Sequence, residues 1–296
     1  MSKKLMLIVN PAAGKGGYKM NFGEAMNALD RGGYQVTLFF TSGKGDATLF
    51  AREHAEEYDT IACVGGDGTL SEVISGLMEL KNPPPLGYIP MGTANDVATT
   101  LDLPKNDILG AAHRIVYGSP HPYDVGGFGS AQYFAYIAAF GAFTEVSYAT
   151  PQSQKKALGH LAYVLQGAAQ LPKIEKIRTR IEYDDGVIEE DLLYGSMSNS
   201  TSVAGIVHLP ETLVSLGDGM SELVLVKSPV NIEELGDIAA SVLTQRYDSG
   251  GLIILHTKKA KFTFEKAVPW TRDGEAGGEV EEIELSNHKA AIQFIF

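Results

Sequence analysis

Residues 60–72 read TIACVGGDGTLSE and contain, in order, an apolar run, a glycine-rich turn and the start of a helical pattern. The run Thr60–Val64 shows no polar alternation, which is typical of a strand buried on both faces. Three glycines in the turn cost backbone entropy that an ordinary turn does not require, but they let the main chain approach a phosphate closely. Thr69–Glu72 has the spacing of a capping box, so we expect a helix to begin close to Thr69.

The same strand–turn–helix order continues through the first 125 residues, which predicts a parallel sheet with helices on both faces. Sheets of this kind bind ligands outside the carboxyl ends of their strands. Asp46 is expected to cap a helix by accepting an amide of its first turn. The expected strands are Leu5–Val9, Gln35–Phe40, Thr60–Val64 and Leu86–Ile89, and the expected helices are Tyr18–Asp30, Asp46–Tyr58, Thr69–Leu80, Ala94–Leu101 and Asn106–Tyr117.

The pattern changes after Asp124, where Gly126–Gly129 is interpreted as a hinge or linker. We therefore predict an α/β fold with two domains and a cleft between them: an α/β nucleotide-binding domain at residues 1–126 with a parallel sheet, and a β-rich, sandwich-like domain at 127–296. The strands expected in the second domain are Tyr133–Phe143, Ile174–Tyr183, Val187–Ser198, Glu222–Lys227, Gly251–His256, Lys261–Glu265 and Lys289–Phe296, and its helices are Lys155–Gln170 and Ile232–Leu243.

The formal net charge of the 296 residues is −12. This argues against broad binding of nucleic acid, which needs a basic face. Pairs such as Lys15 with Lys19 and Lys155 with Lys156, and the run Lys173–Arg180, are interpreted as solvated surface. The longest strongly apolar stretch, Tyr133–Phe143, is shorter than the roughly 20 residues of a spanning helix. With Cys63 as the only cysteine, we expect a cytoplasmic protein.

Two further turns resemble the one after Val64 in their position between a strand and a helix. Asn10–Gly17 follows the first strand, and its small residues suit a phosphate-binding turn at a helix N-terminus, although an ordinary turn explains them equally well. Met91–Asp96 follows the fourth strand. There Thr93 is able to bond a nucleotide, but taken alone, capping of the helix by Thr93 or Asn95 is the better interpretation.

Asp67 is the acidic residue inside the second turn, and a carboxylate does not bind phosphate directly. Its presence is explained by a bound Mg²⁺, or alternatively by capping of the helix that follows. Because the turn lies between a strand and a helix, we favour the nucleotide interpretation.

In this order and spacing, the motifs Asn10-Pro-x-x-Gly-x-Gly, Gly65-Gly-Asp-Gly-Thr and Gly92-Thr-x-Asn-Asp resemble the diacylglycerol kinase catalytic domain, which sphingosine and ceramide kinases share. The resemblance extends through Gly45-Asp46-Ala47 to Asp273-Gly274-Glu275. It implies a lipid kinase that uses ATP and Mg²⁺, with diacylglycerol as the default acceptor. It also implies transient, peripheral contact with a membrane, and leaves a homodimer open.

The resemblance assigns roles to particular residues. Asp67, Asp96 and Asp124 are expected to form an acidic network near the catalytic Mg²⁺. A structural Mg²⁺ is expected at Asp218, with carbonyl oxygens of Ser215 and Met220, although a plain Gly-Asp-Gly turn explains the segment as well. The residues expected to contact ATP are Asn10, Pro11, Ala12, Ala13, Gly14, Thr41, Gly66, Asp67, Gly68, Thr69, Leu70, Ser71, Glu72 and Thr93.

Transfer of a phosphoryl group needs neutralisation of the charge on the phosphates, in-line placement of the reacting groups and removal of the acceptor's proton. Asp273 and Glu275 are the candidates for the last task, and the resemblance favours Glu275. The alternative is that Arg272–Glu275 is merely a polar turn.

Two other functions fit parts of this sequence. A kinase of a soluble acceptor, similar to NAD kinases, would keep Gly65–Thr69 without needing the other two turns in this form. A non-catalytic sensor of lipid or nucleotide would tolerate the loss of Asp67, Asp273 or Glu275, yet all three are present.

Overall fold

The computed structural model describes residues 2–14, 21–142, 176–203, 207–210, 214–244, 247 and 250–296. The contacts divide the chain into two compact units. Unit 1 comprises Met1–Val125, Leu216–Asp218 and Lys289–Phe296, and unit 2 comprises Gly126–Ser215 and Gly219–His288. The expected helix Lys155–Gln170 lies outside the described residues, as do Lys15, Gly16, Gly17, Lys19, Lys155 and Lys156.

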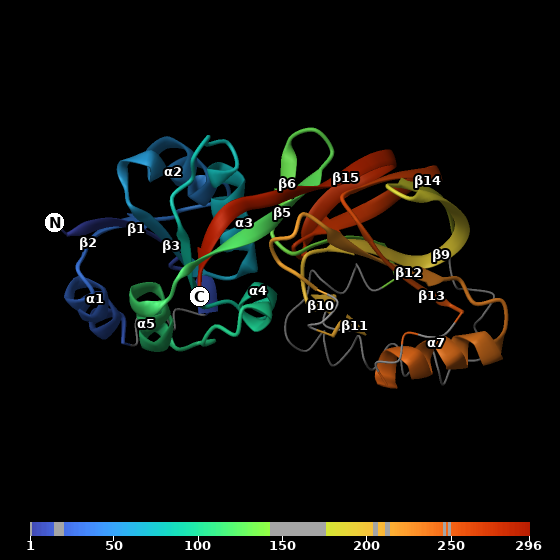
Figure 1. Cartoon of the computed structure of the whole chain (residues 1–296), viewed down its shortest axis with the longest axis horizontal. Coiled ribbons are helices and arrows are strands. Elements are labelled where there is room, and N and C mark those ends of the chain that lie inside the picture. The colour runs from blue at the N-terminus through green and yellow to red at the C-terminus, as the bar shows by residue number, and fades with distance from the viewer. Residues whose placement is uncertain are drawn as a thin grey trace. The chain divides into compact units, whose positions relative to one another are not determined.

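In unit 1, a parallel set of strands is covered by helices on both faces. The strands are β1 (Lys3–Val9), β2 (Tyr34–Phe40), β3 (Thr60–Gly65) and β4 (Leu86–Pro90). β1 pairs in parallel with β2 and β3, and β3 pairs in parallel with β4. Figure 1 shows α1 (Phe22–Arg31) and α5 (Ile108–Tyr117) on one side of these strands, with α2 (Asp46–His54) and α3 (Asp67–Leu77) on the other.

The core of unit 1 forms because its strands are apolar on both faces. On one side, Leu5 and Leu7 of β1 pack with Leu29 of α1 and Ile115 of α5, and all four are buried. Asp107 caps α5 by accepting a hydrogen bond of 2.9 Å from the amide of Gly110. The remaining helices are short: α4 (Asp96–Thr100) and the 3₁₀ helix η2 (Ala55–Glu57).

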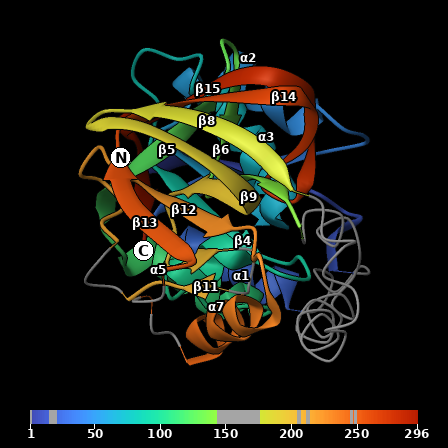
Figure 2. The same cartoon turned by 90° about the vertical axis from the view of Figure 1, so that its right-hand side faces the viewer.

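In unit 2, the strands that pair with one another are antiparallel. Figure 2 shows four of these strands, β8 (Ile177–Tyr183), β9 (Gly186–Ser198), β14 (Lys259–Arg272) and β15 (Glu275–Ile295). Their core holds an aromatic cluster in which the rings of Phe140 and Trp270 lie 4.8 Å apart and Phe262 packs edge-on to Trp270. The strands are β6 (Gln132–Phe134), β7 (Ile137–Gly141), β8 (Ile177–Tyr183), β9 (Gly186–Ser198), β10 (Ser202–Val203), β11 (Val207–His208), β12 (Ser221–Lys227), β13 (Leu252–Thr257) and β14 (Lys259–Arg272).

Two strands, β5 (Pro120–Phe128) and β15 (Glu275–Ile295), contribute residues to both units. The helix α7 (Ile232–Thr244) belongs to unit 2. The α/β class and the strand-rich content expected from the sequence are therefore confirmed.

The hinge or linker expected at Gly126–Gly129 is not an irregular segment, although the division between unit 1 and unit 2 does fall within β5, between Val125 and Gly126. Gly126 to Phe128 belong to β5 and pair with β6. The glycine is needed because the ring of Phe134 lies where a side chain of Gly126 would begin, 2.0 Å from an added Cβ. The first half of β15 was not predicted, because the side chains of Glu275–Glu282 are mostly exposed and show no apolar alternation.

Candidate functional site

The three predicted turns meet at the carboxyl ends of β1, β3 and β4, all within unit 1. The backbone amide of Asn10 donates to Val64 O at 2.9 Å, and that of Met91 donates to Gly65 O at 2.7 Å. The chain leaving β1 and the chain leaving β4 are thus both bonded to the end of β3. This is the arrangement that parallel pairing predicts for turns at one edge of a sheet.

Asn10 connects the first turn with the second. Its Nδ2 donates to Thr69 Oγ1 at 2.9 Å, and its Oδ1 accepts from the amide of Ala12 at 2.9 Å. The predicted capping box is therefore wrong in its residues. α3 begins at Asp67 with Gly66 as its N-cap, and glycine has no side chain that could cap the helix. The Thr69 hydroxyl lies inside the helix and accepts from Asn10 instead.

The backbones of the turns touch where glycines stand. A Cβ added to Gly92 would lie 2.5 Å from Gly66 Cα, and one added to Gly14 would lie 2.5 Å from Met91 O. Gly14 also has a φ of +58°, which other residues adopt with strain. Both glycines are thus required by packing of the third turn against the other two.

Asp67 and Asp96 join the second turn to the third. Asp67 Oδ2 accepts a hydrogen bond of 3.1 Å from the backbone amide of Asp96. Burial raises the pKa of Tyr88 well above its ordinary value, and the negative charges of Asp67 and Asp96 raise it further. These strand ends therefore carry a negative potential, which suits a cation.

Glu72 holds the loop that follows β2. Its Oε1 accepts from the amide of Gly45 at 2.9 Å, and its backbone carbonyl accepts from Thr48 Oγ1 at 2.9 Å.

The predicted cap by Asp46 is also wrong: Gly45 is the N-cap of α2, and Asp46 Oδ2 accepts from the amides of Ser42 and Gly43 before the helix. Thr41, buried beside this loop, donates its amide to Val9 O.

Asn95 closes the third turn. It is 1% exposed, its Oδ1 accepts from the Gly92 amide at 2.9 Å, and its Nδ2 donates to Gly92 O at 3.0 Å. It is the N-cap residue of α4 but makes no side-chain cap bond. Tyr88 OH also donates to its Oδ1, at 3.3 Å. Sequence reasoning missed Tyr88, because a tyrosine within an apolar strand carries no signal of function.

The remaining acidic residue of the predicted network, Asp124, is fully buried. Its Oδ1 accepts from the amide of Ala290 at 2.6 Å, and its own amide donates to Leu216 O at 2.6 Å. These bonds join three separate segments of unit 1. The predicted link from Asp124 to Asp67 and Asp96 stays a prediction.

The predicted structural metal site lies in the turn before β12. Ser215 and Asp218 are exposed, and Met220 O accepts from Asn287 Nδ2 at 3.0 Å. A carbonyl oxygen has two lone pairs, so this bond leaves one for a cation. In the part of the chain that the structure describes, no group of three or more histidine, cysteine or acidic side chains is placed to hold a metal.

In unit 2, Asp273 and Glu275 flank the turn between β14 and β15 but differ sharply in surroundings. Asp273 is 4% exposed, with Oδ2 accepting from the Ala135 amide at 2.6 Å and Oδ1 from the amides of Tyr136 and Ile137 at 3.0 and 3.2 Å. Its backbone has a φ of +46°. Glu275 is solvent-exposed. Asp273 thus clamps the chain before β7, while Glu275 faces outward.

Arg272, the residue before this turn, is half-buried. Burial lowers its pKa, although the charges of Asp273 and Glu275 oppose that effect. Its Nη1 donates to Tyr133 O at 2.7 Å, and its guanidinium lies 5.6 Å from the Phe128 ring.

Comparison with known proteins connects these features with a family. The profile of the diacylglycerol kinase catalytic domain matches residues 4–128. The diacylglycerol kinase of Bacillus subtilis (strain 168) is 35% identical over 279 residues, covering 93% of this chain and 91% of that protein. The diacylglycerol kinase of Staphylococcus aureus (strain MRSA252) is 37% identical over 292 residues, covering 95% and 88%.

Solved structures give the same result. The crystal structure of a diacylglycerol kinase from Bacillus anthracis str. Sterne aligns with a TM-score of 0.77 at 25% identity, covering 99% of this chain and 97% of that one. Among the helices that the structure describes, none has the length and apolar character needed to cross a membrane.

Proposed function

This chain belongs to the diacylglycerol kinase family, and from that premise we propose that it transfers the γ-phosphate of ATP to the free hydroxyl of diacylglycerol. The observation that supports this most strongly is the meeting of three glycine-bearing turns in unit 1, joined by the Asn10–Thr69 and Asp67–Asp96 hydrogen bonds. The reaction takes ATP from the cytoplasm and its acceptor from a membrane surface.

The triphosphate binds along these turns. The first turn of α3 has no side-chain cap, so its N-terminal end offers partial positive charge to an anion. The side chain of Asn10 holds the backbone of the Asn10–Gly14 turn by accepting from the Ala12 amide. Glu72 holds the loop beside Thr41 by accepting from the Gly45 amide. Thr93, exposed on the third turn, is free to reach the nucleotide from the solvent side.

The residues at the strand ends fit Mg²⁺. Asp67 and Asp96 supply oxygen ligands, directly or through water, in a region of negative potential. When bound with ATP, the ion neutralises charge on the phosphates. A second, structural ion would be held by the carboxylate of Asp218 with carbonyl oxygens of Ser215 and Met220.

Glu275 takes the proton from the acceptor hydroxyl, and Asp273 is a positioning residue. The lone pairs of Asp273 are already directed at three amides, whereas Glu275 is exposed. Replacing Glu275 by Gln keeps the shape and removes the base, so turnover with saturating ATP should fall about 100-fold or more. Near-normal turnover would remove Glu275 from this role.

A panel of acceptors tests the proposed function. The enzyme is incubated with γ-labelled ATP, Mg²⁺ and mixed micelles that contain diacylglycerol, monoacylglycerol, phosphatidylglycerol, undecaprenol or sphingosine, and the label is extracted into chloroform. We expect label in phosphatidic acid. Label that stays in water with a soluble acceptor would indicate a kinase of the NAD kinase type. Binding of ATP and lipid without transfer would indicate a sensor.

A further inference from the structure

A cavity of about 810 Å³ lies in unit 2, and none of the residues assigned above to ATP, metal or proton transfer lines it. It is lined by α7 on one side and by residues of β8, β9 and β12 on the other. The basic side chains belong to β8, to β12 and to the residue before β8, and the acidic ones belong to β9 and α7. The charged lining residues are Lys176, Arg178, Lys227, Glu190, Asp191, Glu234 and Asp237.

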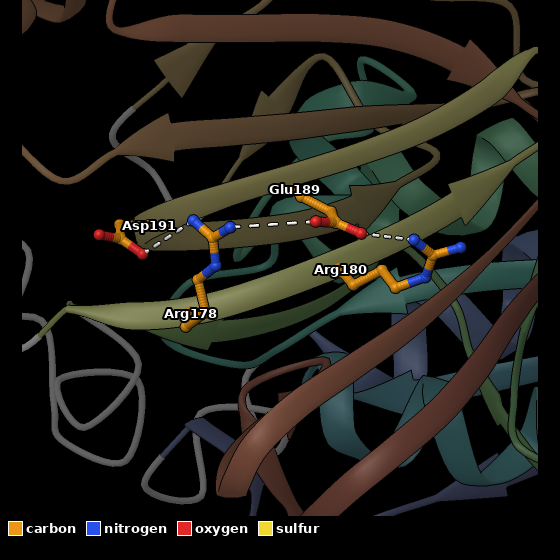
Figure 3. A network of polar contacts seen from close by, with 4 residues as sticks. All are labelled: Arg178, Arg180, Glu189 and Asp191. Atoms are coloured by element: carbon orange, nitrogen blue, oxygen red, sulfur yellow. Dashed lines mark hydrogen bonds and ion pairs between the residues drawn. The ribbon is translucent and has the colours of Figure 1, made fainter.

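Most of the charge on the strand side is already balanced. Arg178 pairs with Asp191 at 3.3 Å, and Lys227 pairs with Glu190 at 2.8 Å. Figure 3 shows Arg178 and Arg180 alternating with acidic side chains across β8 and β9. The interpretation of these two arginines as ordinary surface charge therefore agrees with their pairing.

Three charged lining residues differ from these pairs. Among the described residues, no ion pair is formed by Lys176 on the strand side or by Glu234 and Asp237 on α7. Ser228 is 7% exposed, and its hydroxyl has no partner within the described part of the chain. A buried hydroxyl left in this state lowers stability. The cavity thus offers a ligand the ammonium group of Lys176, the carboxylates of Asp237 and Glu234, and the hydroxyl of Ser228.

Two exposed apolar side chains, called the rim here, stand at the start of α7. Val230 lines the cavity and is 69% exposed, and Ile232, the first residue of α7, is 54% exposed. Asn231 Oδ1 accepts from the Glu234 amide at 2.8 Å, while Glu234 Oε2 accepts from the Val230 amide at 2.9 Å. These two bonds fix the backbone, so the apolar side chains are held outward by a stable helix start.

We propose that this rim and cavity are the surface by which the enzyme docks on a bilayer of zwitterionic phospholipid. Val230 and Ile232 enter the interface, while a headgroup in the cavity places its phosphate toward Lys176 and its amine toward Asp237. The net charge of −12 and the acidic start of α7 oppose docking on an anionic surface. The inference rests on the proposed function, because a kinase of a membrane lipid must reach that lipid in its bilayer.

Vesicle binding tests the docking surface without any turnover. Val230 and Ile232 are both replaced by Asp, which the helix N-terminus tolerates. The matched control is Val187→Asp, because Val187 is also an exposed apolar residue, 51% exposed, but lies on β9 outside the cavity. Cosedimentation is measured with phosphatidylethanolamine–phosphatidylcholine vesicles and with phosphatidylglycerol vesicles, and circular dichroism checks folding.

We expect the wild-type protein to prefer the zwitterionic vesicles, the double variant to bind them about tenfold more weakly, and Val187→Asp to bind them normally. Asp237→Lys should reverse the preference toward phosphatidylglycerol. Unchanged binding by the double variant, an equal loss in Val187→Asp, an unaltered preference in Asp237→Lys, or a wild-type preference for phosphatidylglycerol would each overturn the proposal.

A second assay separates this inference from the proposed function. Dihexanoylglycerol is soluble as single molecules, so its phosphorylation needs no docking. The double variant should phosphorylate it at the wild-type rate and lose activity only on long-chain diacylglycerol in vesicles. An equal loss on both acceptors would contradict docking. If the wild-type protein phosphorylates neither, the proposed function fails, while the vesicle-binding result still decides the docking surface.

Discussion

Asn10 and Thr69 stand 59 positions apart in the sequence, yet Asn10 Nδ2 donates a hydrogen bond of 2.9 Å to Thr69 Oγ1. This bond ties the turn after β1 to the first turn of α3. The bond from the Asp96 amide to Asp67 Oδ2 ties the same helix start to the turn after β4. The glycine-bearing turns are therefore one connected structure. A substitution that displaces one of them should also displace the others.

Replacing Asn10 by Ala removes the bond to Thr69 and the acceptor for the Ala12 amide. Because each lost hydrogen bond costs about 1 kcal/mol, we expect the affinity for ATP to fall about tenfold or more. Isothermal titration with ATP and Mg²⁺ measures this directly. Asn27→Ala, at an exposed position of α1, is the control and should bind normally. Equal affinity for ATP in the two variants would contradict the proposal that the hydrogen bonds of Asn10 hold the turn after β1 in its binding conformation.

Replacing Gly92 by Ala places a methyl group 2.5 Å from Gly66 Cα. The backbones must separate, so the free energy of unfolding should fall by about 1–3 kcal/mol and ATP binding should weaken. Gly43→Ala is the matched control, because no atom lies within 4 Å of its added Cβ. Chemical denaturation of both variants checks this. A stable Gly92→Ala protein would show that the turns need not touch.

Replacing Asp273 by Asn removes the charge that three backbone amides share. We expect the free energy of unfolding to fall by about 1–3 kcal/mol, because hydrogen bonds to a charged acceptor are stronger than neutral ones. Denaturant unfolding monitored by the fluorescence of Trp270, which is buried in the core of unit 2, reports this loss. Wild-type stability with abolished turnover would instead assign Asp273 to the chemistry.

Cys63 gives the protein a dependence of stability on pH. Burial, with the charges of Glu72 and Asp67, raises the pKa of its thiol above the ordinary value of 9.0. Above pH 9 the unfolded chain loses this proton while the native state keeps it, so stability falls as pH rises. Tyr88, with an ordinary pKa of 10.0, acts in the same direction above pH 10.

Replacing Cys63 by Ala should therefore flatten the fall in unfolding free energy between about pH 9 and 10, where one such group contributes about 1.4 kcal/mol per pH unit. Urea unfolding at a series of pH values measures the slope. The offset caused by the smaller side chain is the same at each pH and does not alter that slope. An identical slope in both proteins would contradict the burial of the thiol in the native state.

The sequence predicted the strand ends of unit 1 well, because each turn combines glycine with a polar residue directly after an apolar run. It failed where a side chain bonds a partner far along the chain. Thr69 and Glu72 have the spacing of a local cap, but Asn10 and Gly45 are their partners. The expected cap by Asp46 failed for a local reason, because its carboxylate accepts from Ser42 and Gly43 before the helix and not from the helix itself.

The same limitation explains the errors in unit 2. Gly126 has the composition of a linker, and only the ring of Phe134 against it reveals a strand. The contrast between Asp273 and Glu275 was also hidden, because two carboxylates in one turn look alike until the amides of Ala135, Tyr136 and Ile137 are in place.

The most direct test of the whole account compares the wild-type protein with Asp67→Asn in one assay, transfer of label from γ-labelled ATP to diacylglycerol in mixed micelles with Mg²⁺. The substitution preserves the shape of the side chain while removing its charge at the strand ends. We predict labelled phosphatidic acid from the wild-type protein and a loss of about 100-fold or more in the variant. Undiminished transfer by Asp67→Asn, or no phosphatidic acid from the wild-type protein, would contradict the account.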